Sequence, residues 1–163
     1  PVDILVNNVG DFEINSVAQT TYARWDHLIK SNLYSAFICS QSALKNMRRR
    51  KWGRIVNLTM AASEKLAAAP RIAAYAAAKQ AVLLLTKSLA AEEIKNGITV
   101  NAVGPGIIDT GYSAREKKEL IRLCPTGRFG TPEEVARAIV FLCQPESGYI
   151  TGTHLTVAGG WGL

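Results

Sequence analysis

The chain has 163 residues, of which 48% are hydrophobic and 20% charged, and its formal net charge is +6 at pH 7. This length and composition are those of one ordinary globular domain and argue against a disordered or membrane-spanning chain. The longest apolar run, residues 81–85, is far shorter than the roughly 20 residues that cross a bilayer. The chain also opens without a signal-peptide pattern, so we expect a cytoplasmic protein with no membrane partner.

The sequence contains few residues that could form a metal site or a nucleic-acid site. Its cysteines and histidines are few and widely spaced: Cys39, Cys124, Cys143, His27 and His154. We therefore expect neither a metal site nor a disulfide framework. The densest positive charge, residues 48–51, follows an apolar-periodic segment, where cations complement the negative end of a helix. No nucleic-acid motif accompanies it, so nucleic acid is not an expected partner.

The first predicted element is a strand. Residues 1–6 are apolar and β-rich and stop at Asn7-Asn8-Val9-Gly10, the pattern of a buried strand that ends in a turn. From about residue 21 to residue 49, apolar residues recur at helical spacing, with Thr20 or Thr21 as N-cap. That segment predicts one long helix or two abutting helices, ended by Gly53.

The middle of the chain repeats this alternation. Residues 54–59 predict a second buried strand, and a loop of small residues follows to about Pro70. Residues 73–95 have the composition and periodicity of a long helix, with Asn96-Gly97 as its C-terminal stop. Residues 98–103 predict a third strand, which ends at Gly104-Pro105-Gly106.

After a polar segment over residues 110–130, Thr131-Pro132-Glu133-Glu134 opens a helix that runs to about Cys143. Residues 153–157 predict the fourth strand, followed by Gly159-Gly160. Strands that alternate with long helices imply parallel pairing through right-handed crossovers. We therefore predict an α/β fold, a Rossmann-like three-layer sandwich with about four parallel strands, as a single domain over residues 1–163.

Ligands of such sheets bind beyond the carboxyl ends of the strands. Residues 7–10, 59–63, 104–110 and 157–160 follow the predicted strands directly. The unusual residues of this chain thus gather where chemistry is expected.

One side-chain pair could carry that chemistry. Tyr75 and Lys79 are four residues apart in a helix made mostly of Ala and Leu, so they share one face. A phenol ordinarily loses its proton near pH ~10, and a neighbouring ammonium lowers that pKa. The pair could then donate and accept a proton. The same spacing on a surface helix is usually a solvated pair, so its meaning depends on the surrounding motifs.

Six motifs occur together and in order. They are Asn7-Asn8-Val9-Gly10, Ser31-Asn32-Leu33, Arg54-Ile55-Val56-Asn57, Tyr75-Ala76-Ala77-Ala78-Lys79, Asn101-Ala102-Val103-Gly104-Pro105-Gly106 and Thr151-Gly152. This constellation resembles the short-chain dehydrogenase/reductase family, of the 3-oxoacyl-carrier-protein reductase type, over essentially the whole chain. The resemblance implies an NAD(P)-dependent enzyme that moves a hydride between nicotinamide and a carbonyl or secondary alcohol. A 3-oxoacyl thioester is the first candidate substrate, with a sugar or steroid-like alcohol left open.

The resemblance also implies roles for individual residues. Tyr75 would donate the proton to the substrate oxygen or remove it in the reverse direction. Lys79 would lower the Tyr75 pKa and hold the nicotinamide ribose, and Asn32 would anchor a water of the proton relay. Cofactor contacts are implied on the adenine side and around the nicotinamide and pyrophosphate, for Asn7, Val9 and Gly10 and for Pro105, Gly106, Ile108 and Thr110 respectively.

Elementary chemistry agrees with part of this assignment. The segment Gly104-Pro105-Gly106 lets backbone approach a flat ring, and the Thr110 hydroxyl can bond an amide or phosphate oxygen. Alternatives stay open for the asparagines. Asn7 and Asn8 could cap a turn, and Asn32 could be a helix-interior side chain bonded to a backbone carbonyl.

The chain departs from the family in the residue that follows the second strand. Members usually carry a serine there whose hydroxyl binds the substrate carbonyl, and a strand-anchored alignment places Met60 at that position. A thioether donates no hydrogen bond, so one stabilising contact is missing. Thr59 and Ser63 offer hydroxyls nearby, and Ser63, twelve residues before Tyr75, is the candidate substitute. An ordinary loop serine is the alternative.

The chain also begins at what corresponds to the family's fourth strand. The first βαβαβ half is absent, with its glycine-rich phosphate turn and the residue that selects NAD or NADP, so either cofactor stays possible. An apolar strand at residues 1–6 would then leave an unpaired edge. We expect a fragment of a longer enzyme or a second chain that covers this edge.

Two further expectations concern partners. Family members are commonly dimers or tetramers, which implies a homo-oligomer with the helices over residues 21–49 and 73–95 at the interface. The segment 113–129, which would cover the substrate, is basic and suits an anionic or carrier-bound acyl substrate, or is merely solvated. Because of Met60 and the absent phosphate loop, a non-enzymatic binding or assembly subunit is the alternative to an enzyme.

Overall fold

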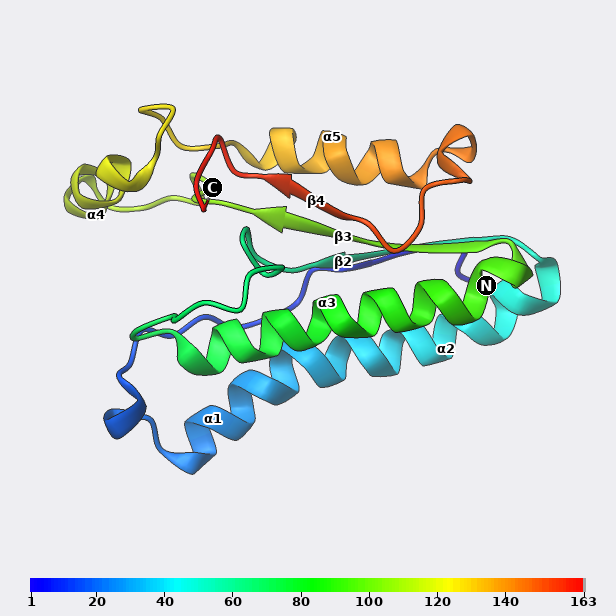
Figure 1. Ribbon diagram of the computed structural model, residues 1–163, viewed down its shortest axis with the longest axis horizontal. Helices are drawn as coiled ribbons and strands as arrows, with labels where there is room; N and C mark the ends of the chain where they lie inside the picture. Colours follow the sequence, from blue (N-terminus) through cyan, green and yellow to red (C-terminus); the bar gives the residue numbers. More distant parts are fainter. Residues whose placement is uncertain (163) are drawn as a thin grey trace.

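The computed structural model describes residues 1–162 and has a central parallel sheet of four strands in the order β1-β2-β3-β4. The strands are β1 (Ile4–Asn7), β2 (Gly53–Leu58), β3 (Ile98–Pro105) and β4 (His154–Val157). Figure 1 shows α2 (Ser35–Arg50) and α3 (Ala73–Glu93) on one face of the sheet and α5 (Pro132–Cys143) on the other. The predicted three-layer, Rossmann-like α/β fold is confirmed.

The strands pair in a register that brings the carboxyl ends of all four to one edge of the sheet. Asn7 lies opposite Asn57, Leu58 opposite Val103, and Pro105 opposite Val157. Figure 1 shows the loop after β2 and the short helix α4 (Ala114–Leu120) beyond this edge. Side chains from four distant parts of the sequence therefore meet there.

The predicted helix over residues 21–49 is in fact two helices with a wide turn between them. Helix α1 (Tyr22–Ile29) is capped by Thr21, whose hydroxyl accepts a hydrogen bond from Arg24 N. A π-helical turn, Lys30–Tyr34, then leads into α2. Such turns insert an extra residue into the helix and re-aim the side chains they carry. Asn32, one of the predicted site residues, lies in this turn.

The ends of the later helices follow their sequence signals. After α3 and a 3-10 turn (Ile94–Asn96), Gly97 adopts a φ of +71°, and an added Cβ there would lie 2.2 Å from Lys51 O. Helix α5 begins with a capping box between Thr131 and Glu134 and has a proline in its first turn. Both boundaries agree with prediction.

Helix α4 was not predicted, because residues 110–130 are too polar to show an apolar period. Its start is nevertheless encoded. Ser113 accepts a hydrogen bond from Glu116 N, and the Glu116 carboxylate accepts one from Ser113 N. The Ser-x-x-Glu spacing that allows this capping box was the available signal. Three shorter 3-10 turns, Val17–Gln19, Ile121–Leu123 and Pro145–Ser147, complete the described structure.

Two hydrophobic clusters hold the layers together. One joins the sheet to α2 and α3 through residues such as Met47, Ile55 and Val100, and the other joins it to α5 through residues such as Val103 and Leu142. Strand β2 is buried along its whole length. Strand β1 is not, because within residues 1–162 it pairs on one side only.

The prediction of a buried first strand is therefore wrong for its side chains: Val2, Ile4 and Val6 are exposed along this edge. The expectation of an unpaired apolar edge agrees with the structure. In the described part of the chain, no helix combines the length and the apolar character needed to span a bilayer.

Candidate active site

The predicted proton pair lies at the start of α3, next to the carboxyl end of β2. Lys79 is 5% exposed, and its Nζ donates a hydrogen bond to Leu58 O at 2.9 Å. Nζ also lies 5.6 Å from the centre of the Tyr75 ring. Burial lowers the pKa of Lys79 to about 8, because removal of water disfavours the ammonium. The amine therefore titrates close to neutral pH.

Tyr75 is half-buried, and its ring meets that of Phe12 edge to face with centroids 5.0 Å apart. Burial raises the pKa of Tyr75, and Tyr112 raises it further. The prediction that Lys79 lowers this pKa is thus not met here. The physical reason is that burial disfavours both charged forms, the phenolate and the ammonium. It moves the two pKa values apart, that of Tyr75 upward and that of Lys79 downward.

Asn32 turns its side chain toward this pair from the π-helical turn. Its Nδ2 donates to Leu28 O at 3.0 Å and to Asp11 O at 2.9 Å, so the predicted backbone-bonding role is present. Its Oδ1 is buried and accepts no hydrogen bond from any residue of the described chain. Leaving a buried acceptor unpaired costs about 1–3 kcal/mol. A water or a ligand hydroxyl at Oδ1 would remove that cost.

Gly10 closes the third side of this space. A Cβ added to Gly10 would lie 2.2 Å from Asn32 Oδ1 and 3.4 Å from Lys79 Nζ. Only a residue without a side chain fits there. Gly10, Asn32 and Lys79 thus surround one point from the end of β1, the π-helical turn and α3. An unpaired acceptor and a buried amine at one point suit a polyhydroxylated ligand such as a ribose.

The other residues predicted after β1 are placed differently. The Asn7 amide donates to Asn57 Oδ1 at 2.7 Å and to Ser40 Oγ at 3.1 Å, which ties β1 to β2 and α2. This is a structural use of the side chain, closer to the alternative reading than to a ligand contact. Val9 is 75% exposed on the surface beside Gly10.

Gly104, in β3, and Gly106, directly after it, make room for other parts of the protein. A Cβ at Gly104 would lie 2.3 Å from His154 Nε2, and one at Gly106 would lie 2.8 Å from the Cβ of Ala158. At these two positions the space left by the missing Cβ is therefore occupied by protein. Their side-chain directions are filled by β4 and the turn after it.

The remaining residues of that segment lie beyond the strand. Pro105 ends β3, and Ile108 forms a bridge with Gly130 and packs on the α5 side of the core. Thr110 is exposed. The segment thus runs from the sheet edge out to the surface over a few residues.

The hydroxyls near Met60 are already engaged. Ser63 Oγ donates to Met60 O at 2.8 Å and accepts from Met60 N at 3.2 Å, which closes a turn. Thr59 Oγ1 lies 3.1 Å from Val103 O and 2.8 Å from His154 Nε2. Neither hydroxyl is hydrogen-bonded to Tyr75 in the described chain. The structure favours the loop-serine alternative for Ser63.

The basic residues around α4 are largely neutralised by nearby carboxylates. The pairs are Arg115 with Glu119, Lys117 with Asp109, and Arg128 with Glu134. Because these positive charges are already paired, they give less support to an anionic substrate. The basic end of α2 is also engaged: Arg48 forms an ion pair with Glu93 and Arg50 with Asp3, and Lys51 donates a hydrogen bond to the Asn96 amide oxygen. That supports the helix-end interpretation of residues 48–51.

Sequence reasoning missed Phe12, whose ring contacts Tyr75, and Tyr112, which raises the Tyr75 pKa, because nothing in their local pattern marks them. It also gave no role to His154. Over residues 1–162, no group of three His, Cys, Asp or Glu side chains could hold a metal ion.

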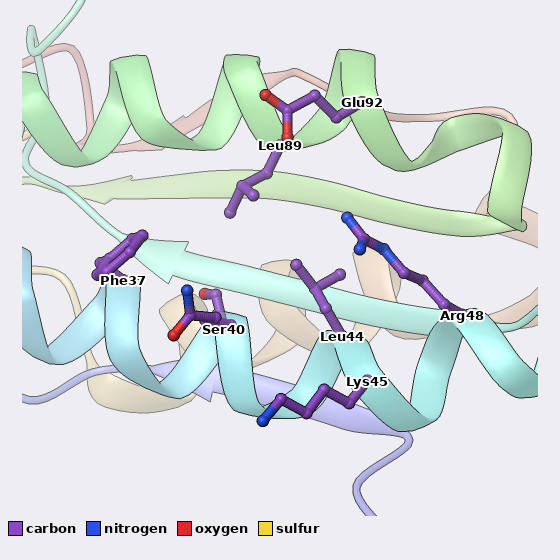
Figure 2. Close-up of a pocket in the computed structure, with 8 residues that line it drawn as sticks. Phe37, Ser40, Leu44, Lys45, Arg48, Leu89 and Glu92 are labelled. Carbon is purple, nitrogen blue, oxygen red and sulfur yellow. The ribbon is translucent and has the colours of Figure 1, made fainter.

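A groove lies elsewhere, between α2 and the C-terminal half of α3, with a volume of about 480 Å³. Figure 2 shows Phe37 and Leu44 of α2 and Leu89 of α3 pointing into the space between the helices. Tyr75, in the first turn of α3, does not line it. The groove is therefore separate from the candidate site around Tyr75, Lys79 and Asn32.

Comparison with known proteins assigns the chain to a family. A sequence profile of the family described as Enoyl-(Acyl carrier protein) reductase matches residues 1–162. The 3-oxoacyl-[acyl-carrier-protein] reductase FabG of Vibrio cholerae is 39% identical over 163 residues, which cover 98% of this chain and 66% of that protein. The chain thus spans just under two thirds of that relative's length.

Two further relatives carry names that denote other substrates or a lack of activity. The inactive 2-(S)-hydroxypropyl-CoM dehydrogenase 2 of Xanthobacter autotrophicus is 39% identical over 170 residues, 98% of this chain and 73% of that protein. The crystal structure of an Agrobacterium tumefaciens protein assigned as a gluconate dehydrogenase superposes with a TM-score of 0.91 at 35% identity, covering 98% of this chain and 65% of that one. By profile, identity and fold together, the chain belongs to the short-chain dehydrogenase/reductase family.

Proposed function

We propose that the protein is an NAD(P)-dependent oxidoreductase in which Tyr75 moves the proton that accompanies hydride transfer between nicotinamide and a carbonyl or secondary alcohol. The observation that carries the proposal is the meeting of Lys79 Nζ with the unpaired Oδ1 of Asn32, one helical turn from Tyr75. The named relatives, which include reductases and dehydrogenases, support the same reaction class.

Lys79 would hold the sugar of the cofactor. An ammonium has three protons, and one of them is used by Leu58 O. The others can be donated to ribose hydroxyls at the point that Gly10 leaves open. Bound nicotinamide would supply or accept the hydride. Val9, Gly10, Pro105, Gly106, Ile108 and Thr110 stay as proposed cofactor contacts, whereas Asn7 is proposed to act through the strand that it ties down.

Tyr75 would hold the proton. Its raised pKa keeps the phenol protonated at neutral pH, which suits donation to the oxygen of a carbonyl that is being reduced. A new O–H bond forms on the substrate as the phenolic O–H bond breaks. The phenolate would then be reprotonated through Lys79 and a water bound at Asn32 Oδ1.

For the substrate we propose a class of compounds rather than one molecule. A 3-oxoacyl thioester, free or carrier-bound, is the first candidate because of the resemblance to the Vibrio cholerae protein. With Met60 beside the site and Ser63 bonded to it within a turn, no hydroxyl there is free to bind the substrate carbonyl without rearrangement. Phe12, 55% exposed against Tyr75, would give the substrate an apolar wall instead.

The proposal is tested with the intact natural protein. NADH and NADPH binding is measured by calorimetry, followed by turnover of an acetoacetyl thioester in both directions. Binding of either nucleotide with measurable hydride transfer is the expected result. Failure to bind either one would instead support the second candidate function, a non-enzymatic binding or assembly subunit. Met60, the engaged Ser63 hydroxyl and the inactive Xanthobacter relative are the observations that favour that candidate.

We also propose that the protein is a homo-oligomer. Phe37 of α2 lines the groove of Figure 2 and is exposed, and two further large apolar side chains of these helices, Ile38 of α2 and Leu84 of α3, are exposed as well. Exposed apolar surface of this kind marks protein interfaces. A second copy of the chain would bury it by presenting the same two helices.

A further inference from the structure

A histidine that the proposed reaction does not use lies buried between the sheet and the loop after β2. The side chain of His154, the first residue of β4, is 0% exposed. Its Nε2 lies 2.8 Å from Thr59 Oγ1, its Nδ1 lies 3.5 Å from Glu64 Oε1, and the Met60 carbonyl also faces the ring. Gly104 of the neighbouring strand lacks the Cβ that would strike Nε2. These contacts therefore fix the imidazole ring in a single orientation.

The protons of this cluster can be arranged in two complete ways. With a neutral ring, Nδ1–H points to the Glu64 carboxylate and Nε2 accepts the Thr59 hydroxyl proton. With a charged ring, Nε2–H donates to Thr59, whose hydroxyl then donates to Val103 O, 3.1 Å away. Val103 O is paired in either case, because Thr59 N donates to it at 2.9 Å. Gaining a proton thus redirects one hydroxyl and adds a positive charge beside Glu64.

These contacts hold both ends of a segment that borders Tyr75 and Lys79. Leu58 O, which precedes Thr59, binds Lys79 Nζ. Met60 and Ser63 form the turn that follows, and Glu64 ends it. Movement of this segment would displace Leu58 O, the acceptor that orients Lys79, and the Met60 side chain beside the site.

The same segment contains strained backbone. Ala62 has a φ of +63°, a left-handed conformation that costs an L-residue about 1–2 kcal/mol. Such residues persist only where the surroundings fix them. On one side Ala61 N donates to Pro105 O at 2.9 Å, and on the other Glu64 faces His154. The contact between Glu64 and His154 is therefore part of what holds the turn.

We propose that His154 is a positioning residue of the active site: through Thr59 and Glu64 it fixes residues 58–64, and protonation of its ring tightens that hold. The effect on turnover rests on the proposed function, whereas the hold itself does not. The inference assigns no contact between His154 and substrate.

The charged groups that act on the ring are Glu64 from the loop and Lys87 from α3. Burial is the largest effect and lowers the pKa of His154, Glu64 opposes it, and Lys87 adds to it. The pKa of the ring therefore lies below its ordinary value, and the tightened state gains population as the pH falls.

The test is an NMR titration of the His154 ring together with amide hydrogen exchange. Glu64→Gln keeps the size of the side chain but removes its charge, so the titration of His154 should shift to lower pH. Thr59→Val should speed exchange of the Ser63 and Lys65 amides about fivefold, and Thr59→Ser should restore it. Glu146→Gln, an exposed carboxylate elsewhere, is the matched control and should change neither reading.

An unshifted His154 titration in Glu64→Gln, or unchanged exchange in Thr59→Val, would each overturn the inference. In the intact protein, the acid limb of the kcat profile of Glu64→Gln should move with the His154 titration while KM for the nucleotide stays constant. An immobile acid limb would overturn the link to catalysis. A mixed result is that the variants change the His154 titration and the amide exchange as expected while neither the wild type nor any variant turns over a carbonyl substrate. In that case the proposed function fails, and the positioning of residues 58–64 by His154 stands.

Discussion

Gly10 and Asn32 approach each other so closely that one methyl group on Gly10 would lie 2.2 Å from the Asn32 Oδ1 atom. That oxygen is the unpaired acceptor of the candidate active site. The contact links the turn after β1 to the π-helical turn without any hydrogen bond to Oδ1.

Gly10→Ala should therefore displace Asn32 and disturb Lys79. We expect a loss of at least about tenfold in nucleotide affinity, because the added methyl group fills the space where the ligand would bind. Calorimetric titration with NADH and NADPH gives the measurement. Gly148→Ala is the control, since its Cβ would meet only Pro145 O at 3.1 Å and the NH2 group of Arg54 at 3.5 Å. Equal affinity in wild type and Gly10→Ala would contradict the assigned binding point.

Burial of Lys79 should cost stability at neutral pH. Its pKa of about 8 lies below the ordinary value of 10.5, so between these values the unfolded chain binds more protons than the folded one. The free energy of unfolding should therefore rise with pH through this window, by about 3 kcal/mol at most. Lys79→Met should be more stable than wild type at pH 7 and lose that advantage toward pH 10.5.

Urea unfolding at a series of pH values measures this difference. Lys45→Met, which removes an exposed lysine of α2, is the control and should show no such trend. A stability difference between Lys79→Met and wild type that is constant with pH would show that Lys79 titrates normally.

Arg48 should matter because its partner is buried. The Glu93 side chain is 0% exposed and accepts hydrogen bonds from Arg48 and Asn96. Arg48→Met would leave a buried carboxylate without its cation, which is costly, whereas replacing both partners is not. We expect the single variant to lower the melting temperature by several degrees and Arg48→Met with Glu93→Leu to recover most of the loss.

The pH dependence of this pair has a defined sign. The Arg48 hydrogen bond lowers the pKa of Glu93 in the folded chain. The stability from this pair should therefore be complete above the ordinary pKa of 4.5 and vanish as the pH falls through the lower, folded value. Calorimetric melts of wild type and the single variant Arg48→Met between pH 7 and pH 3 should converge. Parallel curves would refute the assignment.

Phe37→Asp should dissociate the proposed oligomer. A carboxylate in the middle of a buried apolar interface is costly, so the molar mass from light scattering should fall to that of one chain. Tyr149→Asp, which changes a fully exposed aromatic residue beyond α5, should leave the mass unchanged. A wild-type protein that is already monomeric, or a Phe37→Asp variant of unchanged mass, would sink the proposal.

The layers of the fold were predictable because they depend on local periods. Apolar runs marked all four strands, and helical periodicity with capping residues marked α3 and α5. Helix α4 is too polar for that signal, and its capping box was the only trace of it. The π-helical turn left no trace, since a single inserted residue barely changes the apolar spacing around Asn32.

The site was predictable only where residues are close in sequence or belong to a family motif. Tyr75 and Lys79 share a helix face. By contrast, His154 and Thr59 are 95 positions apart and meet because β3 stands between their strands. Gly104 looked like a ligand-approach residue and proved to make room for that histidine. The Tyr75 pKa was misjudged for a similar reason, because burial depends on the whole fold.

The most direct measurement of the central claim is the turnover of Tyr75→Phe in the intact protein, with nucleotide affinity measured on the same sample. The ring contact with Phe12 and the position of Lys79 survive this change, and only the phenolic proton is lost. We predict a fall in kcat of about 100-fold or more with nucleotide affinity within a factor of about two. Unchanged turnover would contradict the account.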